Sequence, residues 1–201
     1  MKSSLILNLA ALLKNTRMAG PGLRDVVWVQ GCRIDCRGCA NQAYLPHEPR
    51  IQMPVERLII HFKARTDQID GCSVSGGEPT EQAEGVGMLL REVKKLGLST
   101  VVFTGRTLKS LQDNPTYQDI LKYTDLLIDG PFILAQQDST LQWRGSKNQR
   151  LHLLSDRWTK EEIEQSQPNG EIVISKNQVL FNGVGTRAII EKHNRHYTDL
   201  I

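Results

Sequence analysis

Three of the chain's four cysteines, Cys32, Cys36 and Cys39, lie within a stretch of eight residues. The segment just before them, residues 25–30, is rich in β-branched residues and predicts a buried strand that Gly31 ends. Residues 31–50 show neither strand nor helix periodicity, so we expect the three cysteines to share one loop at the end of that strand. Thiols placed so close together favour metal binding over a disulfide framework.

The spacing of these cysteines, Cys-x3-Cys-x2-Cys, limits the kind of metal centre. A structural zinc site needs four ligands, so three thiolates alone do not complete one. The same three thiolates can hold three irons of a four-iron, four-sulfur ([4Fe–4S]) cluster and leave the fourth iron open. Two alternatives stay open: a zinc site completed by His47 or Cys72, and reduced thiols without metal. Cys72 lies in an apolar strand pattern and is more typical of a small buried hydrophobe.

A second motif, Ser75-Gly76-Gly77-Glu78-Pro79, follows the predicted strand 71–75 and precedes a helix. Two adjacent glycines allow a ligand to approach the backbone closely. Glu78 places a carboxylate at the carboxyl end of a parallel strand, where α/β sheets bind ligands. An ordinary turn with an acidic residue at a helix N-terminus would have the same appearance.

Strand-like and helix-like segments alternate along the first 150 residues, which indicates βαβ units and a mainly parallel sheet. We expect strands at residues 25–30, 71–75, 99–104 and 126–128, and helices at 54–64, 80–96, near 108 and at 117–123. The apolar run 5–13 predicts a buried strand or helix, because no small-residue cleavage site follows it as in a signal peptide. From about residue 151 the pattern changes to a short surface helix, 159–165, and a hairpin built from 171–175 and 178–182.

The composition is that of an ordinary globular chain, with 39% hydrophobic and 23% charged residues, and excludes collagen-like or disordered proteins. There are 25 Lys+Arg and 22 Asp+Glu residues, and the basic ones are scattered, so we expect no nucleic-acid partner. No stretch approaches the roughly 20 apolar residues that span a membrane, so we expect no membrane association. Clustered reduced thiols favour the cytoplasm.

The cysteine triplet followed by Gly-Gly-Glu-Pro resembles the radical S-adenosylmethionine (radical SAM) enzymes, and more closely the activating enzymes of glycyl radical enzymes. Further similar segments lie at Gly20-Pro21-Gly22 with Arg24, and at residues 29–32, 38–41, 103–107, 127–132 and 143–149. Three positions depart from the pattern. Gly38 stands where many superfamily members have an aromatic residue, Ala40 replaces an imidazole or phenol, and Arg106 replaces a tyrosine.

The resemblance implies an α/β fold: a partial (β/α) TIM-like barrel of the radical SAM type with a C-terminal β-hairpin extension. Residues 1–150 would form the radical SAM core, and residues 151–201 an extension packed on it. It also implies that Cys32, Cys36 and Cys39 hold the cluster. The implied S-adenosylmethionine contacts are Gly38, Cys39 and Ala40 beside the adenine, Gly76, Gly77 and Glu78 at the methionine end, and Thr104 and Asp129 as further polar contacts.

The implied activity is reductive cleavage of S-adenosylmethionine to a 5′-deoxyadenosyl radical, which generates a glycyl radical on a partner such as anaerobic ribonucleotide reductase. The cofactors carry this chemistry, so no side chain has to act as an acid or base. A flavodoxin or ferredoxin would donate the electron, and Arg33 and Arg37 on the cysteine loop suit an acidic donor. Trp143 and Arg144 are candidate anchors for the partner. The alternatives are a radical SAM enzyme acting on a small molecule and a non-catalytic iron–sulfur electron-transfer protein.

Overall fold

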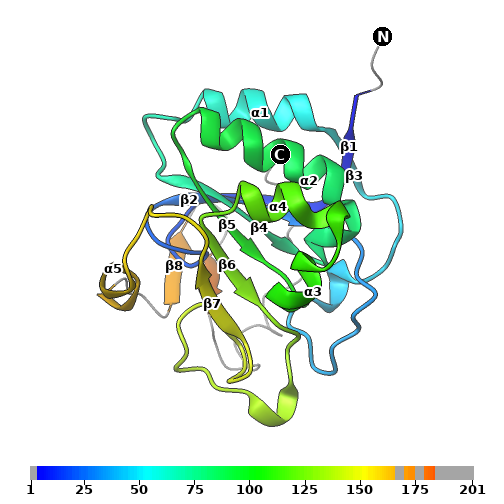
Figure 1. Ribbon diagram of the computed structural model, residues 1–201, viewed down its shortest axis with the longest axis vertical. Helices are drawn as coiled ribbons and strands as arrows, with labels where there is room; N and C mark the ends of the chain where they lie inside the picture. The colour runs from blue at the N-terminus through cyan, green and yellow to red at the C-terminus, as the bar shows by residue number, and fades with distance from the viewer. Residues whose placement is uncertain (1–3, 166–169, 175–178, 184–201) are drawn as a thin grey trace.

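The computed structural model describes residues 4–165, 170–174 and 179–183, and its centre is a seven-stranded sheet (Figure 1). In chain order the strands are β1 (Ile6–Thr16), β2 (Arg24–Val29), β3 (Ile51–Pro54), β4 (Gly71–Gly76), β5 (Ser99–Phe103), β6 (Leu126–Asp129) and β7 (Arg150–Leu153). Their order across the sheet is β3-β1-β2-β4-β5-β6-β7. The expected strands are present, and the apolar run near the start of the chain is β1.

The sheet is mixed rather than mainly parallel, which corrects the expectation from the sequence. β2, β4, β5 and β6 are parallel neighbours, whereas β1, β3 and β7 each run antiparallel to the strand beside them. β3 and β7 were not predicted, because each has only four residues and no alternation of its own. Pairing with β1 and β6 defines them, and that pairing is not a local property of the sequence.

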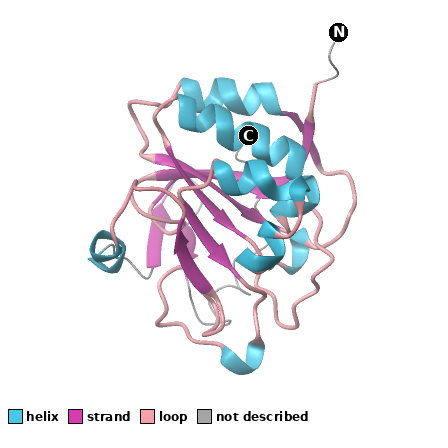
Figure 2. Ribbon diagram, in the orientation of Figure 1, coloured by secondary structure: helices cyan, strands magenta, loops and turns pink. Residues whose placement is uncertain are grey.

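Helices cover one face of the sheet (Figure 2). The helices of this layer are α1 (Val55–Lys63), α2 (Ala83–Lys95), α3 (Leu108–Gln112) and α4 (Gln118–Lys122). The loops also contain the short 3-10 turns η1 (Gln42–Tyr44), η2 (Pro79–Gln82), η3 (Pro115–Tyr117) and η4 (Leu134–Gln136). The expected helix 80–96 begins as η2 and continues as α2, because Glu78 accepts a hydrogen bond from the Thr80 N–H and caps the first turn.

The main hydrophobic core lies between these helices and the sheet. Leu58 and Phe62 of α1 and Leu90 of α2 are at most 1% exposed and pack against strand residues such as Val27 and Val74. Burying one such side chain contributes about 1.5–3 kcal/mol relative to leaving it in water. Apolar burial therefore fixes the helical layer.

A smaller cluster occupies the opposite face of the sheet. Successive strand residues point to opposite faces, so Leu126 and Ile128 belong to this cluster whereas Leu127 belongs to the helical core. Trp143 and Ile163, the latter from α5 (Lys160–Gln165), complete it. The chain beyond residue 151 therefore contacts the sheet through at least one buried side chain.

Arg24, at the start of β2, is fully buried and ties the amino ends of three strands together. Its Nε donates to Ser73 Oγ at 2.8 Å, and Nη1 donates to Pro21 O at 2.7 Å and Ser99 Oγ at 2.9 Å. Nη2 donates to Cys72 O at 2.8 Å and Ser99 O at 3.0 Å. All five guanidinium N–H groups thus have acceptors. Burial lowers the pKa of Arg24 to about 10.

Two further strands, β8 (Gly170–Ile174) and β9 (Val179–Gly183), pair antiparallel at the position of the expected hairpin. Residues 175–178 and 184–201 lie outside the described residues, so the hairpin as a whole stays a prediction. The division into a core of residues 1–150 and an extension of 151–201 also stays a prediction. Among the described residues, no helix is long and apolar enough to cross a membrane.

Candidate functional site

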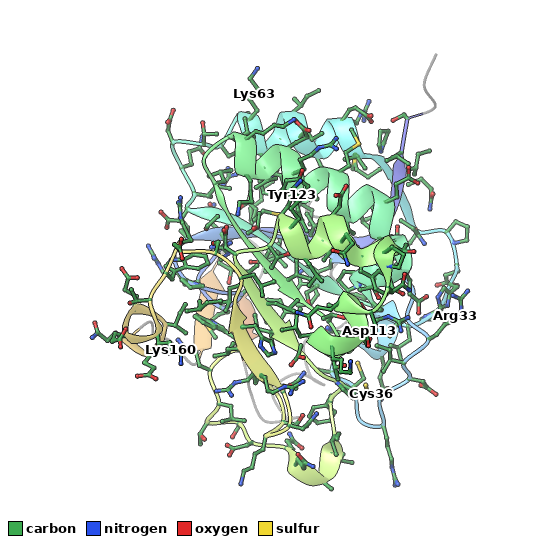
Figure 3. All side chains as sticks on the ribbon, viewed as in Figure 1. Arg33, Cys36, Lys63, Asp113, Tyr123 and Lys160 are labelled. Carbon is green, nitrogen blue, oxygen red and sulfur yellow. The ribbon has the colours of Figure 1, made fainter. Side chains whose placement is uncertain are left out.

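The three clustered cysteines lie on the loop that follows β2, at the carboxyl edge of the parallel strands, where Figure 3 labels Arg33 and Cys36. Each of the three thiols is free and partly exposed. The Gly31 N–H donates to Tyr44 O at 2.8 Å, and the Cys32 N–H donates to Leu45 O at 3.0 Å. These two bonds join the beginning of the loop to its end. The loop is therefore a closed structure with its cysteines between the joined ends.

Backbone N–H groups act on two of the three thiols. Those of Ile34 and Asp35 lower the pKa of Cys32, and the Asn41 N–H donates to Cys39 Sγ at 3.4 Å. Burial raises the pKa of both Cys32 and Cys39, and these hydrogen bonds only partly oppose it. N–H groups directed at sulfur stabilise the thiolate form, which is the form that ligates iron. The donor set therefore fits an iron–sulfur cluster.

A mononuclear zinc site is not supported. Among the residues that the structure describes, no three His, Cys, Asp or Glu side chains converge where one ion could bind. Cys72 is fully buried in the helical core, where burial raises its pKa far above the usual value. His47 Nε2 lies 2.5 Å from Glu81 Oε2. A [4Fe–4S] cluster takes each thiolate at a different iron, so the cysteines need not converge on one point.

The Gly-Gly-Glu-Pro turn lies directly against the cysteine loop. The Gly77 N–H donates to Val29 O and the Glu78 N–H donates to Gly31 O, both at 2.8 Å. A Cβ on Gly77 would overlap the Gly31 carbonyl, and Gly76 has a φ of +114°, a left-handed conformation that favours glycine. The two glycines are thus required for the turn and the cysteine loop to touch through their backbones.

Glu78 and Thr104, both predicted as S-adenosylmethionine contacts, bind each other. The Glu78 carboxylate is 1% exposed and accepts from Thr104 Oγ1 at 2.7 Å, Thr80 Oγ1 at 2.7 Å, and the N–H groups of Thr80 and Gly105 at 3.0 and 2.9 Å. Glu78 therefore joins the turn after β4 to the turn after β5. Its contact with the cosubstrate, like that of Thr104, stays a prediction.

Asp129, at the end of β6, is fully buried and also has protein partners. Its carboxylate accepts from the Leu108 N–H at 2.6 Å and from Arg150 Nη2 at 3.0 Å, and His152 Nε2 lies 3.1 Å away. Burial raises the pKa of Asp129, but these bonds outweigh it and hold the pKa below its usual value. Its predicted cosubstrate contact is untested.

On the other side of the cysteine loop, Gly38 has a φ of +80° and faces Phe132 and Leu134. Ala40 is exposed. An apolar and aromatic environment is thus present beside Gly38 although the residue itself has no side chain. The predicted adenine contacts at Gly38, Cys39 and Ala40 stay predictions.

Known proteins resemble most of this chain. It is 38% identical over 141 residues to the anaerobic ribonucleoside-triphosphate reductase-activating protein of Vibrio cholerae, which covers 66% of this chain and 89% of that protein. The corresponding protein of Escherichia coli is 30% identical over 143 residues, 67% of this chain and 91% of that protein. The family model described as "4Fe-4S single cluster domain" matches residues 18–152. The chain belongs to this family.

A pyruvate formate-lyase-activating enzyme of Staphylococcus epidermidis is 30% identical over 118 residues, 54% of this chain and 46% of that enzyme. Among solved structures, QueE from Escherichia coli shares 16% identity over 51% of this chain and 53% of that one, with a TM-score of 0.42, too low to establish a common fold. Membership among the [4Fe–4S] activating enzymes, predicted from the motifs, is confirmed.

In this [4Fe–4S] family member, the burial of one candidate residue and two contacts of the site were not predicted. Trp143 is 7% exposed and packs in the smaller cluster, so little of its side chain is available to a partner in this structure. The docking role of Trp143 and Arg144 stays a prediction. Asn41 donates from Nδ2 to Gly76 O at 3.3 Å, and Glu81 accepts from the Arg33 N–H at 2.8 Å. Neither contact had a signal in the sequence, because the partners lie 35 and 48 positions apart.

Proposed function

We propose that this chain is a radical SAM enzyme that generates a glycyl radical on a partner protein of the anaerobic ribonucleotide reductase type. One observation carries the proposal: three partly exposed thiols share a loop, and the Gly76-Gly77 turn lies against that loop by backbone hydrogen bonds. Within the described part of the chain, no three His, Cys, Asp or Glu side chains converge on a position for one ion. A cluster held by these three thiols alone would have one corner open beside a glycine-lined backbone.

When bound, a [4Fe–4S] cluster and S-adenosylmethionine supply one-electron cleavage of a carbon–sulfur bond, giving methionine and a 5′-deoxyadenosyl radical. Cys32, Cys36 and Cys39 would hold the cluster. The backbone of Gly76 and Gly77 would border the methionine end of the cosubstrate, and Gly38 its adenine. Glu78 would hold the turn in place through its four hydrogen bonds. The protein's part is orientation and exclusion of solvent rather than proton transfer.

The fold that goes with this function is a partial (β/α) barrel of the radical SAM type, with residues 1–150 as its core and 151–201 as an extension packed on it. The four parallel strands β2, β4, β5 and β6 support it, because their carboxyl ends share the edge that carries the site. A barrel that is not closed leaves a side open to a protein substrate. We place the enzyme in the cytoplasm, because reduced thiols and a low-potential cluster need a reducing compartment.

The electron donor would be a flavodoxin or ferredoxin. Arg33 and Arg37 are exposed on the cysteine loop, and cations there suit an acidic donor protein. Raising the ionic strength should therefore slow reduction by such a donor more than reduction by the small anion dithionite.

The test is anaerobic reconstitution with iron and sulfide, reduction with dithionite, and measurement of 5′-deoxyadenosine and methionine. The expected result is equal amounts of the two products, and a glycine-centred radical in paramagnetic resonance when an anaerobic ribonucleotide reductase is added. A reconstituted cluster that cleaves no S-adenosylmethionine would instead indicate an electron-transfer protein. Cleavage that a small molecule stimulates and the reductase does not would indicate a small-molecule enzyme.

A further inference from the structure

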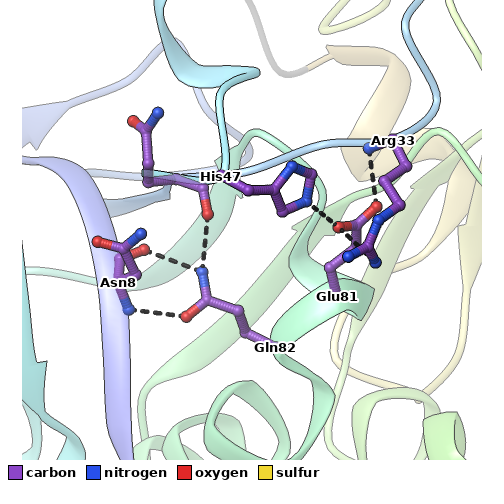
Figure 4. Close-up of a pocket in the computed structure, with 6 residues that line it drawn as sticks. Asn8, Arg33, His47, Glu81 and Gln82 are labelled. Atoms are coloured by element: carbon purple, nitrogen blue, oxygen red, sulfur yellow. Dashed lines mark hydrogen bonds and ion pairs between the residues drawn. The ribbon is translucent and has the colours of Figure 1, made fainter. Parts of the chain in front are cut away.

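Glu81, on η2 directly after the Gly-Gly-Glu-Pro turn, binds both ends of the cysteine loop (Figure 4). Its Oε1 accepts from the Arg33 N–H at 2.8 Å, and its Oε2 lies 2.5 Å from His47 Nε2 and 3.5 Å from Arg33 Nη1. The Glu81 side chain is 8% exposed, whereas those of His47 and Arg33 are 42% and 77% exposed. A buried carboxylate thus sits at the centre of the contact, with its two partners at the rim.

The Glu81 contacts lie next to the backbone hydrogen bonds that close the cysteine loop. Gly31 and Cys32 are joined to Tyr44 and Leu45 by backbone hydrogen bonds. Arg33 directly follows Cys32 and His47 lies two residues after Leu45, and Glu81 bridges them from a different element. Since Arg33 directly follows Cys32, the position of the first cysteine depends on this bridge.

The short helix η2 is itself held rigidly. Gln82 Nε2 donates to Asn8 O at 2.9 Å and Gln30 O at 3.0 Å, and Gln82 Oε1 accepts from the Asn8 N–H at 2.7 Å. The side-chain amide therefore acts as an extra peptide unit between β1 and the end of β2 (Figure 4). Because Gln82 fixes η2 to the sheet, Glu81 presents its carboxylate from a rigid base.

We propose that Glu81 is a positioning residue that holds the cysteine loop in register with the glycine turn. Among the described residues, no hydrogen bond or ion pair joins the Glu81 side chain to the cysteine sulfurs or the turn glycines, so we infer that it acts through Arg33 and His47. Glu78, the N-cap of η2, lies three residues before Glu81, and its N–H donates to Gly31 O. Glu78 and Glu81 therefore hold the cysteine loop at two points. The proposal rests on the proposed function, because the register matters only if cluster and cosubstrate meet there.

The test compares Glu81→Ala and Glu81→Gln with Glu84→Gln, which removes an exposed acid from the first turn of α2 and serves as the matched control. Each reconstituted protein is analysed for iron and sulfide, for the paramagnetic resonance spectrum of the reduced cluster with and without S-adenosylmethionine, and for KM and kcat of deoxyadenosine formation. We expect Glu81→Ala to raise KM for S-adenosylmethionine about tenfold and to change the spectrum, as loss of a hydrogen bond to a charged group predicts.

Glu81→Gln should recover much of the wild-type spectrum, because its amide oxygen can still accept from the Arg33 N–H. His47→Ala, at a half-exposed position, should give a smaller change of the same kind. If Glu81→Ala matches Glu84→Gln in spectrum and KM, or only lowers the unfolding temperature, the proposal is wrong. If Glu81→Ala does not fold, the cluster spectra and KM values of Glu81→Gln and His47→Ala test the proposal instead. Wild-type values in both of these variants would then contradict it. If wild type builds its cluster but cleaves nothing, the proposed function fails, while the spectra still test the loop contact.

Discussion

The helical face of the sheet and its carboxyl edge are held together by different forces. The helical face is a layer of buried apolar side chains such as Leu58, Phe62 and Leu90. The carboxyl edge is held by backbone and charge-assisted hydrogen bonds around Glu78 and Glu81. Apolar packing is non-directional, whereas a hydrogen bond needs its donor at a set distance and angle. We therefore expect substitutions in the core to change stability, and substitutions at the edge to change chemistry first.

Two cysteines test the difference between core and edge most directly, because Cys72 lies in the helical core and Cys39 lies at the carboxyl edge. Cys39→Ala should abolish both cluster assembly and deoxyadenosine formation, since a cluster corner loses its thiolate. Cys72→Ala should assemble a full cluster and cost about 1 kcal/mol of stability, since a small buried side chain is shortened. Iron content measures cluster assembly, and chemical denaturation measures the change in stability. A Cys39→Ala protein with wild-type iron would remove Cys39 from the ligands.

The next largest effect on activity is expected from a substitution at Gly77 in the turn. Gly77→Ala puts a methyl group into the Gly31 carbonyl and should displace the turn, with a loss of roughly a hundredfold in kcat/KM for S-adenosylmethionine. Gly97→Ala is the control, because its φ is +81° but no heavy atom lies within 4 Å of the added Cβ. It should cost about 1–2 kcal/mol of strain and leave kcat/KM unchanged. Equal activity losses in both variants would show that the effect does not come from the contact with the Gly31 carbonyl.

The core counterpart is Phe62→Ala, which empties a fully buried site on α1. The expected cost is about 3–5 kcal/mol in the free energy of unfolding. Activity per folded molecule should stay at the wild-type level, since Phe62 belongs to the apolar core and takes no part in the hydrogen bonds around Glu78 and Glu81. Urea unfolding combined with an activity assay at low temperature checks both statements. A folded variant with altered cluster spectra would contradict the separation between the two regions.

Apart from the control variants, the smallest expected effect concerns a polar cluster at the amino end of the sheet. Buried Asp25 accepts from His61 Nε2 at 2.7 Å and Arg65 Nε at 2.6 Å. Burial raises the pKa of Asp25, but the bonds from His61, the Asn15 N–H and Arg65 outweigh it and leave the pKa below its usual value. Asp25→Asn should cost about 2 kcal/mol at neutral pH.

The pH dependence of that cost follows from the direction of the shift. A carboxyl whose pKa is lower in the folded protein stabilises it above the unfolded pKa of about 3.9. The stabilisation is lost as the pH falls through the lowered folded value, so the difference between wild type and Asp25→Asn should shrink in acid. Urea midpoints measured from neutral pH downward test this. A difference that stays constant would show that the Asp25 charge contributes nothing.

The sequence predicted the central strands, the main helices and the location of the site. β2 and β5 were found because they are rich in β-branched residues, and β4 because two adjacent glycines end a short strand-like segment. α2 was found because its apolar residues recur at helical spacing. The four-residue strands β3 and β7 and the buried position of Trp143 were not found. Each of these depends on neighbours that are distant in the chain.

The cysteine spacing and the adjacent glycines were determined by the sequence alone, because ligand number and backbone freedom are properties of consecutive residues. Only the tertiary structure decided what the acidic side chains around them do. Glu78 meets Thr104 across 26 positions, and Glu81 meets Arg33 across 48. Such contacts arise where the carboxyl ends of separate strands are brought to one edge, and no local pattern records which donors a carboxylate will meet there.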